Sequence, residues 1–100
     1  MLDVSPEHAK MLRDILAREI PGVTVWAFGS RVAGTPKPHS DLDLALLAKG
    51  AVPWSRLARL EEELAESDLP FRVDIVDLAR ASEAFRKIIE EQHEAIQDAG

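Results

Sequence analysis

The sequence predicts a small α/β (α+β) fold in which helices pack on a sheet of about three strands. Apolar residues recur at helical spacing in three segments, and three short runs rich in β-branched or aliphatic residues lie between them. The predicted order is therefore α-β-turn-β-α-β-α. Alternation of this kind favours a layered sheet covered by helices and leaves the strand directions open.

The first half of the chain is expected to hold one helix and one strand. The helix is predicted at residues 6 to 19, between a capping Ser5 and the Pro21-Gly22 pair that ends the segment. Residues 23 to 28 are apolar, β-branched and aromatic, and they are too few for a helix of their own. They are therefore predicted to form a buried strand.

The second half is expected to add two strands and two helices. A loop with two prolines leads to a strand at residues 41 to 47, and Pro53 opens a helix with an apolar stripe. Residues 71 to 78 are predicted to form the third strand, and Ser82 caps a last helix. The apolar residues of that last helix are Phe85, Ile88, Ile89 and Ile96.

Composition limits the class of protein. One hundred residues suffice for one modest core, so residues 1–100 are expected to form a single domain. A net charge of -6 argues against a broad nucleic-acid or anionic membrane surface. No cysteine is present, which excludes disulfides and thiolate zinc sites. No apolar run approaches the roughly 20 residues of a membrane-spanning helix, and we expect a cytoplasmic protein.

An acidic pair opens the second predicted strand. Side chains alternate across a sheet, so Asp41 and Asp43 lie on one face and the leucines between and after them lie on the other. Two adjacent carboxylates repel each other, and a bound cation removes that cost. Magnesium is the natural candidate because it prefers oxygen ligands. The alternative is a solvated strand end, with Asp41 capping the preceding loop.

A third acid interrupts the apolar run of the last predicted strand. Asp74 shares a face with Arg72 and Val76, and an aspartate in mid-strand needs compensation. If this strand lies beside the second one, Asp74 joins Asp41 and Asp43 around the same cation. The alternative is an ion pair with Arg72. Asp77 lies on the opposite face of this predicted strand, near its end, and is expected to cap the following segment.

Gly29, Ser30 and Arg31 are the candidate phosphate-binding residues. Glycine at a strand end lets the backbone approach a ligand closely, and serine adds a hydroxyl donor. If a helical turn starts at Arg31, free amides point to the same place and its guanidinium neutralises a phosphate oxygen. Taken alone, Gly-Ser is also typical of an ordinary turn. Its position relative to the acids favours the phosphate-binding interpretation.

The turn and the acids together resemble a known signature. Gly29-Ser30, ten intervening residues and Asp41-x-Asp43 resemble the nucleotidyltransferase superfamily that includes DNA polymerase β. The sequence around both segments looks like the small prokaryotic minimal nucleotidyltransferase (MNT) group, and the resemblance covers essentially the whole chain. It implies a polymerase β-like fold with a small mixed sheet. It also implies that the turn holds nucleotide phosphates and that the acid pair, with Asp74 as third acid, holds magnesium.

The resemblance implies an activity and a partner. We expect a magnesium-dependent nucleotidyltransferase that uses two metal ions and moves a nucleoside monophosphate, AMP from ATP, onto a partner protein. MNT proteins are often paired with an all-helical HEPN toxin, for which they act as antitoxin, in some cases by attaching AMP to a tyrosine of the toxin. The chain has no room for an acceptor domain, so a partner protein is expected to bind across the site, and an exposed apolar patch beside the sheet would support this expectation. The group commonly has a second arginine in the turn, where this chain has Val32 and Ala33.

A different class of function stays open. The chain would then be a non-catalytic nucleotide-binding or antitoxin module that neutralises its partner by binding and occlusion. Retention of all three acids weighs against it. His39 borders the acids, and its role is not assigned by the sequence.

Overall fold

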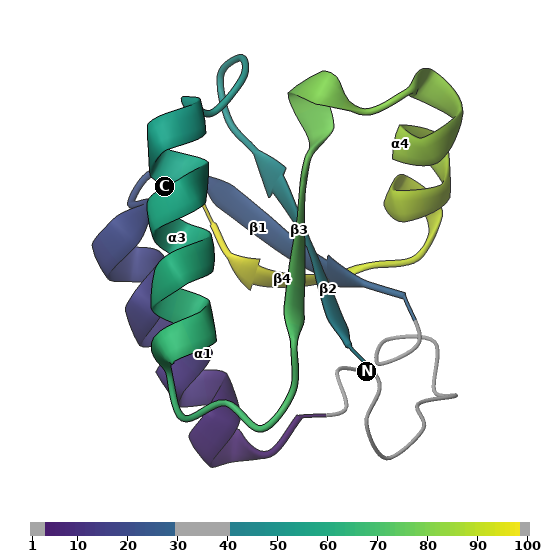
Figure 1. Cartoon of the computed structure of the whole chain (residues 1–100). Coiled ribbons are helices and arrows are strands. Elements are labelled where there is room, and N and C mark those ends of the chain that lie inside the picture. The colour runs from purple at the N-terminus through teal and green to yellow at the C-terminus, as the bar shows by residue number, and fades with distance from the viewer. Residues whose placement is uncertain (1–3, 30–40, 99–100) are drawn as a thin grey trace.

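The computed structural model describes residues 4–29 and 41–98 of the chain (Figure 1). It contains three α-helices, four strands and one short 3₁₀ helix in this part of the chain. In chain order they are α1 (Pro6–Glu19), β1 (Thr24–Phe28), β2 (Leu42–Leu47), α3 (Trp54–Glu66), β3 (Val73–Asp77), η1 (Leu78–Arg80), α4 (Glu83–Glu91) and β4 (Glu94–Gln97). The α/β class predicted from the sequence is confirmed.

The strands form one mixed sheet in the order β3-β2-β1-β4. Strand β1 is antiparallel to both of its neighbours, β2 and β4, whereas β2 and β3 run parallel. The register of β2 and β3 places Asp43 opposite Asp74, and that of β1 and β2 places Phe28 opposite Asp43. The starts of β2 and β3 and the end of β1 therefore meet at the same end of the sheet.

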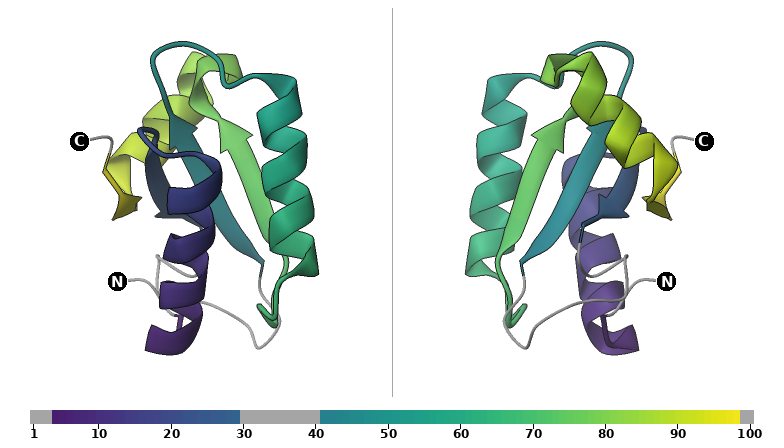
Figure 2. Two further views of the ribbon diagram at one scale, coloured as in Figure 1. Left: turned by 90° about the vertical axis from the view of Figure 1, so that its left-hand side faces the viewer. Right: turned by 90° about the vertical axis from the view of Figure 1, so that its right-hand side faces the viewer.

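The two faces of the sheet are covered differently. Helices α1 and α3 pack on one face, where Leu42, Leu44 and Leu46 are fully buried (Figures 1 and 2). A smaller cluster lies on the opposite face, where Ile89 of α4 packs with Ala45 and Leu78. Alternate side chains of a strand point to opposite faces, so the three leucines of β2 all lie in this first core. The other alternate positions of β2 are thereby directed to the second face.

The sheet has four strands, not the predicted three. The last helix ends at Glu91, and Ile96, which was expected in that helix, lies in β4. Strand β4 pairs with β1, and the Gln97 side-chain amide donates hydrogen bonds to the carbonyls of Ile20 (3.0 Å) and Val23 (2.9 Å). These partners lie more than seventy residues away along the chain, and tertiary pairing of this kind overrides local propensity.

None of the described helices combines the length and the apolar character that a membrane span requires.

Candidate active site

The three predicted acids lie at one end of the sheet. Asp43 and Asp74 are direct neighbours in the parallel pair of β2 and β3, and Asp41 immediately precedes β2. The alternation in β2 turns Asp43 away from the face that α1 and α3 cover, because Leu42 and Leu44 occupy that face. Asp41 is exposed, while Asp43 and Asp74 are half-buried. The structure thus brings together the acids that sequence parity put on one face.

Asp43 carries the electrostatic cost of this arrangement. Burial raises the pKa of its carboxyl above the usual value, and the nearby carboxylates of Asp74 and then Asp41 raise this pKa further. Among the described residues, no basic side chain forms an ion pair with Asp41 or Asp43. Half-buried negative charge without a cationic partner fits a site for a divalent metal ion.

Asp74 has a partner of its own. The Arg72 Nε lies 3.1 Å from Asp74 Oδ1, and the two side chains are 76% and 39% exposed. The ion pair considered from the sequence is therefore present. Within residues 4–29 and 41–98, no three acidic or histidine side chains are gathered closely enough to enclose a metal ion alone. Magnesium commonly takes only one or two protein carboxylates and completes its shell with water and substrate phosphates.

Gly29 lies directly against the Asp43 carboxylate. Its φ of +83° lies in the left-handed region that favours glycine. A Cβ atom at this position would overlap Asp43 Oδ2 and come within 3.3 Å of Asp43 Cγ. The absence of a side chain at residue 29 therefore makes room for the Asp43 carboxylate. The other turn residues, Ser30 and Arg31, and also His39, lie outside the described residues.

We expect Gly29→Ala to lower stability and to displace the Asp43 carboxylate. The left-handed backbone costs an L-residue about 1–2 kcal/mol, and the overlap with Asp43 adds to this cost. Gly22→Ala is the matched control, because Gly22 has a similar φ of +81° and no atom within 4 Å of its Cβ position. Thermal unfolding of both variants separates the cost of the left-handed backbone from the cost of the overlap with Asp43. Equal losses of Tm would contradict the close packing of Gly29 on Asp43.

Asp77 does more than the predicted capping. Its Oδ1 accepts the Ala79 N–H at 3.0 Å, which confirms the cap, and its Oδ2 accepts the Val52 N–H at 2.8 Å and an Arg80 Nη1 hydrogen at 2.6 Å. Asp77 is 7% exposed. Arg80 also stacks over the Trp54 ring, 3.8 Å from its centroid. One carboxylate thus joins the ends of β3 and η1 to the segment that precedes α3, a role that no local sequence pattern indicates.

Residues 10–99 match the family described as polymerase beta, nucleotidyltransferase. The chain belongs to this nucleotidyltransferase family. It is 45% identical over 97 residues to the probable protein adenylyltransferase MntA of Haemophilus influenzae, which covers 97% of this chain and 85% of that protein. Both the expected superfamily and the expected enzyme class are confirmed.

Solved structures show the same fold. A crystal structure of a toxin–antitoxin with AMP-PNP superimposes with a TM-score of 0.76 at 29% identity, covering 94% of this chain and 74% of that one. A complex of tri-AMPylated HEPN toxin with MNT antitoxin from Shewanella oneidensis gives a TM-score of 0.71 at 26% identity, covering 92% and 71%. The individual roles of the acids and of the turn in this nucleotidyltransferase stay predictions.

Proposed function

We propose that this nucleotidyltransferase transfers AMP from ATP to a hydroxyl group of a HEPN-type partner protein, as the antitoxin of a toxin–antitoxin pair. The observation that carries the proposal is the half-buried Asp43 beside Asp74 and Asp41, with no cationic partner among the described residues. The identity to a probable protein adenylyltransferase, and the similarity to complexes with AMP-PNP and with an AMPylated HEPN toxin, support the substrate and the partner. We place the reaction in the cytoplasm.

The proposed chemistry is an in-line displacement at the α-phosphorus of ATP. The partner's hydroxyl oxygen forms a bond to that phosphorus, the bond to the bridging α,β-oxygen breaks, and pyrophosphate leaves. Asp74 accepts the hydroxyl proton. Asp41, Asp43 and Asp74 would hold magnesium, two ions in our proposal, which when bound supplies charge neutralisation at the phosphates. Gly29, Ser30 and Arg31 would hold the leaving phosphates.

The test is transfer of label from ATP to a candidate HEPN-type partner protein. With magnesium, ATP labelled at the α-phosphate should label that protein, while ATP labelled at the γ-phosphate should not, because the γ-phosphate departs with pyrophosphate. Omission of magnesium should abolish labelling. Label from γ-labelled ATP on the partner would indicate kinase chemistry and would contradict the proposal.

Neutralisation by occlusion is a second candidate, and one observation favours it. Arg72 forms an ion pair with one Asp74 oxygen, as expected of an acid with a structural role. The Asp41→Asn, Asp43→Asn double variant separates the two candidates. If it still binds and silences the partner, occlusion is sufficient. If it binds without silencing, AMP transfer is the mechanism of neutralisation.

A further inference from the structure

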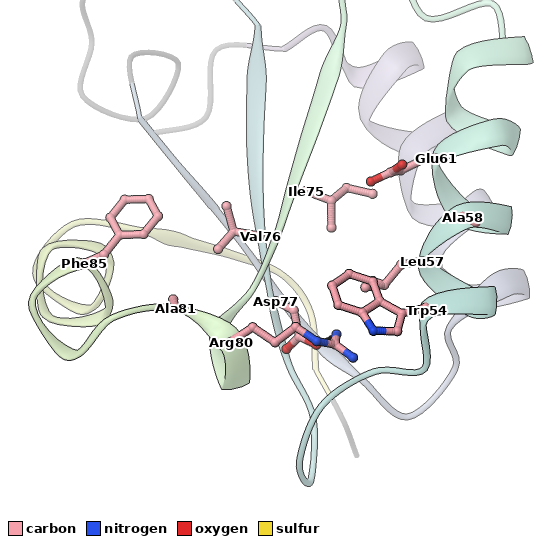
Figure 3. Close-up of a pocket in the computed structure, with 10 residues that line it drawn as sticks. All are labelled: Trp54, Leu57, Ala58, Glu61, Ile75, Val76, Asp77, Arg80, Ala81 and Phe85. Carbon is pink, nitrogen blue, oxygen red and sulfur yellow. Dashed lines mark hydrogen bonds and ion pairs between the residues drawn. The ribbon is translucent and has the colours of Figure 1, made fainter.

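A groove runs along β3 from the acid site to the start of α3. One hollow of about 490 Å³ is lined by Arg72 and Asp74 of the β3 segment and by Leu64 and Ala65 of α3. A second hollow of about 410 Å³ lies between Trp54 on α3 and Phe85 on α4 (Figure 3). Glu61 and Ile75 line both hollows. We call the two together the β3 groove, and its first half contains the proposed general base, Asp74.

The floor of the β3 groove is a sheet edge. Among the described strands, β3 has β2 as its one neighbour. Leu42 N–H donates to the Arg72 carbonyl at 2.8 Å, so Arg72 and the alternate residues after it turn their backbone groups toward β2. Val73 and Ile75 then direct their N–H and C=O groups outward. Such groups are available to another polypeptide chain.

The far half of the groove exposes aromatic surface. Trp54 is 70% exposed and Phe85 is 37% exposed, and they approach the groove from opposite sides of β3 (Figure 3). The stacked guanidinium of Arg80, itself held by Asp77, supports the Trp54 ring from one side. Large aromatic side chains on a fixed support are typical anchors of protein interfaces. An exposed apolar surface beside the sheet, which would support binding of a partner protein, is present here.

We infer that the β3 groove is the docking site of the acceptor protein, an inference that rests on the proposed function. An apolar side chain of the acceptor protein occupies the hollow between Trp54 and Phe85. The hydroxyl group of another acceptor residue reaches Asp74. Val76 lines the apolar hollow and lies two residues after Asp74 on the same face of β3, which corresponds to about 7 Å. The apolar anchor and the hydroxyl of the acceptor are therefore separated by a similar distance.

Charge complementarity defines the acceptor further. The carboxylate of Glu61 stands where the two hollows meet, and the whole chain carries a net charge of -6. A basic side chain between the anchor and the hydroxyl would face Glu61. The charges therefore favour a protein partner with an apolar anchor, an adjacent basic residue and a hydroxyl acceptor over a second copy of this acidic chain.

The test places a long basic side chain in the groove. Ala58 is an exposed residue of α3 that lines the apolar hollow, so Ala58→Arg should fill the hollow and repel a basic acceptor without disturbing the core. Ala17→Arg is the matched control, because Ala17 is exposed on α1 and lies outside both hollows. We expect Ala58→Arg to weaken direct binding of the HEPN-type protein at least tenfold, with an unchanged Kd for AMP-PNP and an unchanged Tm. Ala17→Arg should bind like the wild type.

Direct binding separates this inference from the proposed function. If the wild type binds the partner and Ala58→Arg does not, but no label is ever transferred, the β3 groove is the docking site and the proposed AMP transfer is wrong. Equal partner binding by Ala58→Arg and the wild type would overturn the assignment of the β3 groove as the docking site, even if AMP transfer is observed. Absence of partner binding by the wild type would overturn it as well. A loss of AMP-PNP affinity in Ala58→Arg would assign the hollow to the nucleotide instead.

Discussion

Asp43→Asn is expected to abolish AMP transfer and, in the same protein, to raise the stability of the ligand-free chain. Asp43 is the most crowded of the three acids, since it lies opposite Asp74 and near Asp41. An amide keeps the shape of this side chain but removes the charge that holds a divalent ion. Charge stabilisation by a metal ion is worth several kcal/mol, so the rate of label transfer should fall at least about 1,000-fold.

The gain in stability follows from the raised pKa of Asp43. Because the folded state raises this pKa, the folded protein binds the proton more tightly than the unfolded chain does. Stability is therefore lost as the pH rises from the usual pKa of an aspartate through the raised value, and the full penalty applies at pH values above that raised pKa. Asparagine has no such penalty. We expect Asp43→Asn to raise the Tm by a few degrees at pH 7 and to have a smaller effect at pH 3.

Thermal unfolding without magnesium measures this effect, and Asp68→Asn provides the control. Asp68 is an exposed carboxylate in the segment between α3 and β3, so its replacement should leave the Tm nearly unchanged at both pH values. Magnesium should raise the Tm of the wild type and not that of Asp43→Asn, because a ligand stabilises only the state that binds it. A lower Tm for Asp43→Asn at pH 7 would show that Asp43 already has a cationic partner.

The acid site could be predicted because a strand has a period of two. Parity alone placed Asp41 and Asp43 away from the leucines of β2, and it paired Asp74 with Arg72. What parity cannot supply is the register between strands. Asp43 meets Asp74 because β2 and β3 are adjacent, parallel and in that register, which long-range packing decides.

Other parts of the fold depended on contacts that are distant in sequence. Residues Glu94–Gln97 form a strand because they pair with β1. The Gln97 side-chain amide also donates a hydrogen bond to the Ile20 carbonyl, directly after α1. The β3 groove is equally invisible in the sequence, since its walls come from α3 and α4. Trp54, an exposed aromatic residue on α3, is a sequence signal for it.

Asp77→Ala is expected to give the largest loss of stability among these changes. The Asp77 carboxylate accepts three hydrogen bonds, from Val52, Ala79 and Arg80, and it is almost fully buried. Truncation leaves the Val52 N–H and the Arg80 guanidinium without this acceptor, and such losses cost more than the net value of the bonds themselves. Arg80 keeps some access to water, with 28% of its side chain exposed. We therefore expect a loss of about 2–4 kcal/mol, or about 10–25 °C in Tm.

Asp77→Asn tests whether charge or hydrogen bonding carries this effect. The amide oxygen can replace one of the two carboxylate oxygens, but the NH₂ group then faces an N–H donor that the other oxygen served. It also loses the charge that faces Arg80 at 2.6 Å. Urea unfolding should therefore rank the wild type above Asp77→Asn, and Asp77→Asn above Asp77→Ala. Because Arg80 supports Trp54, both variants should also weaken binding of the partner protein at temperatures where they remain folded. Wild-type stability in Asp77→Ala would mean that this carboxylate does not join β3 and η1 to the segment before α3.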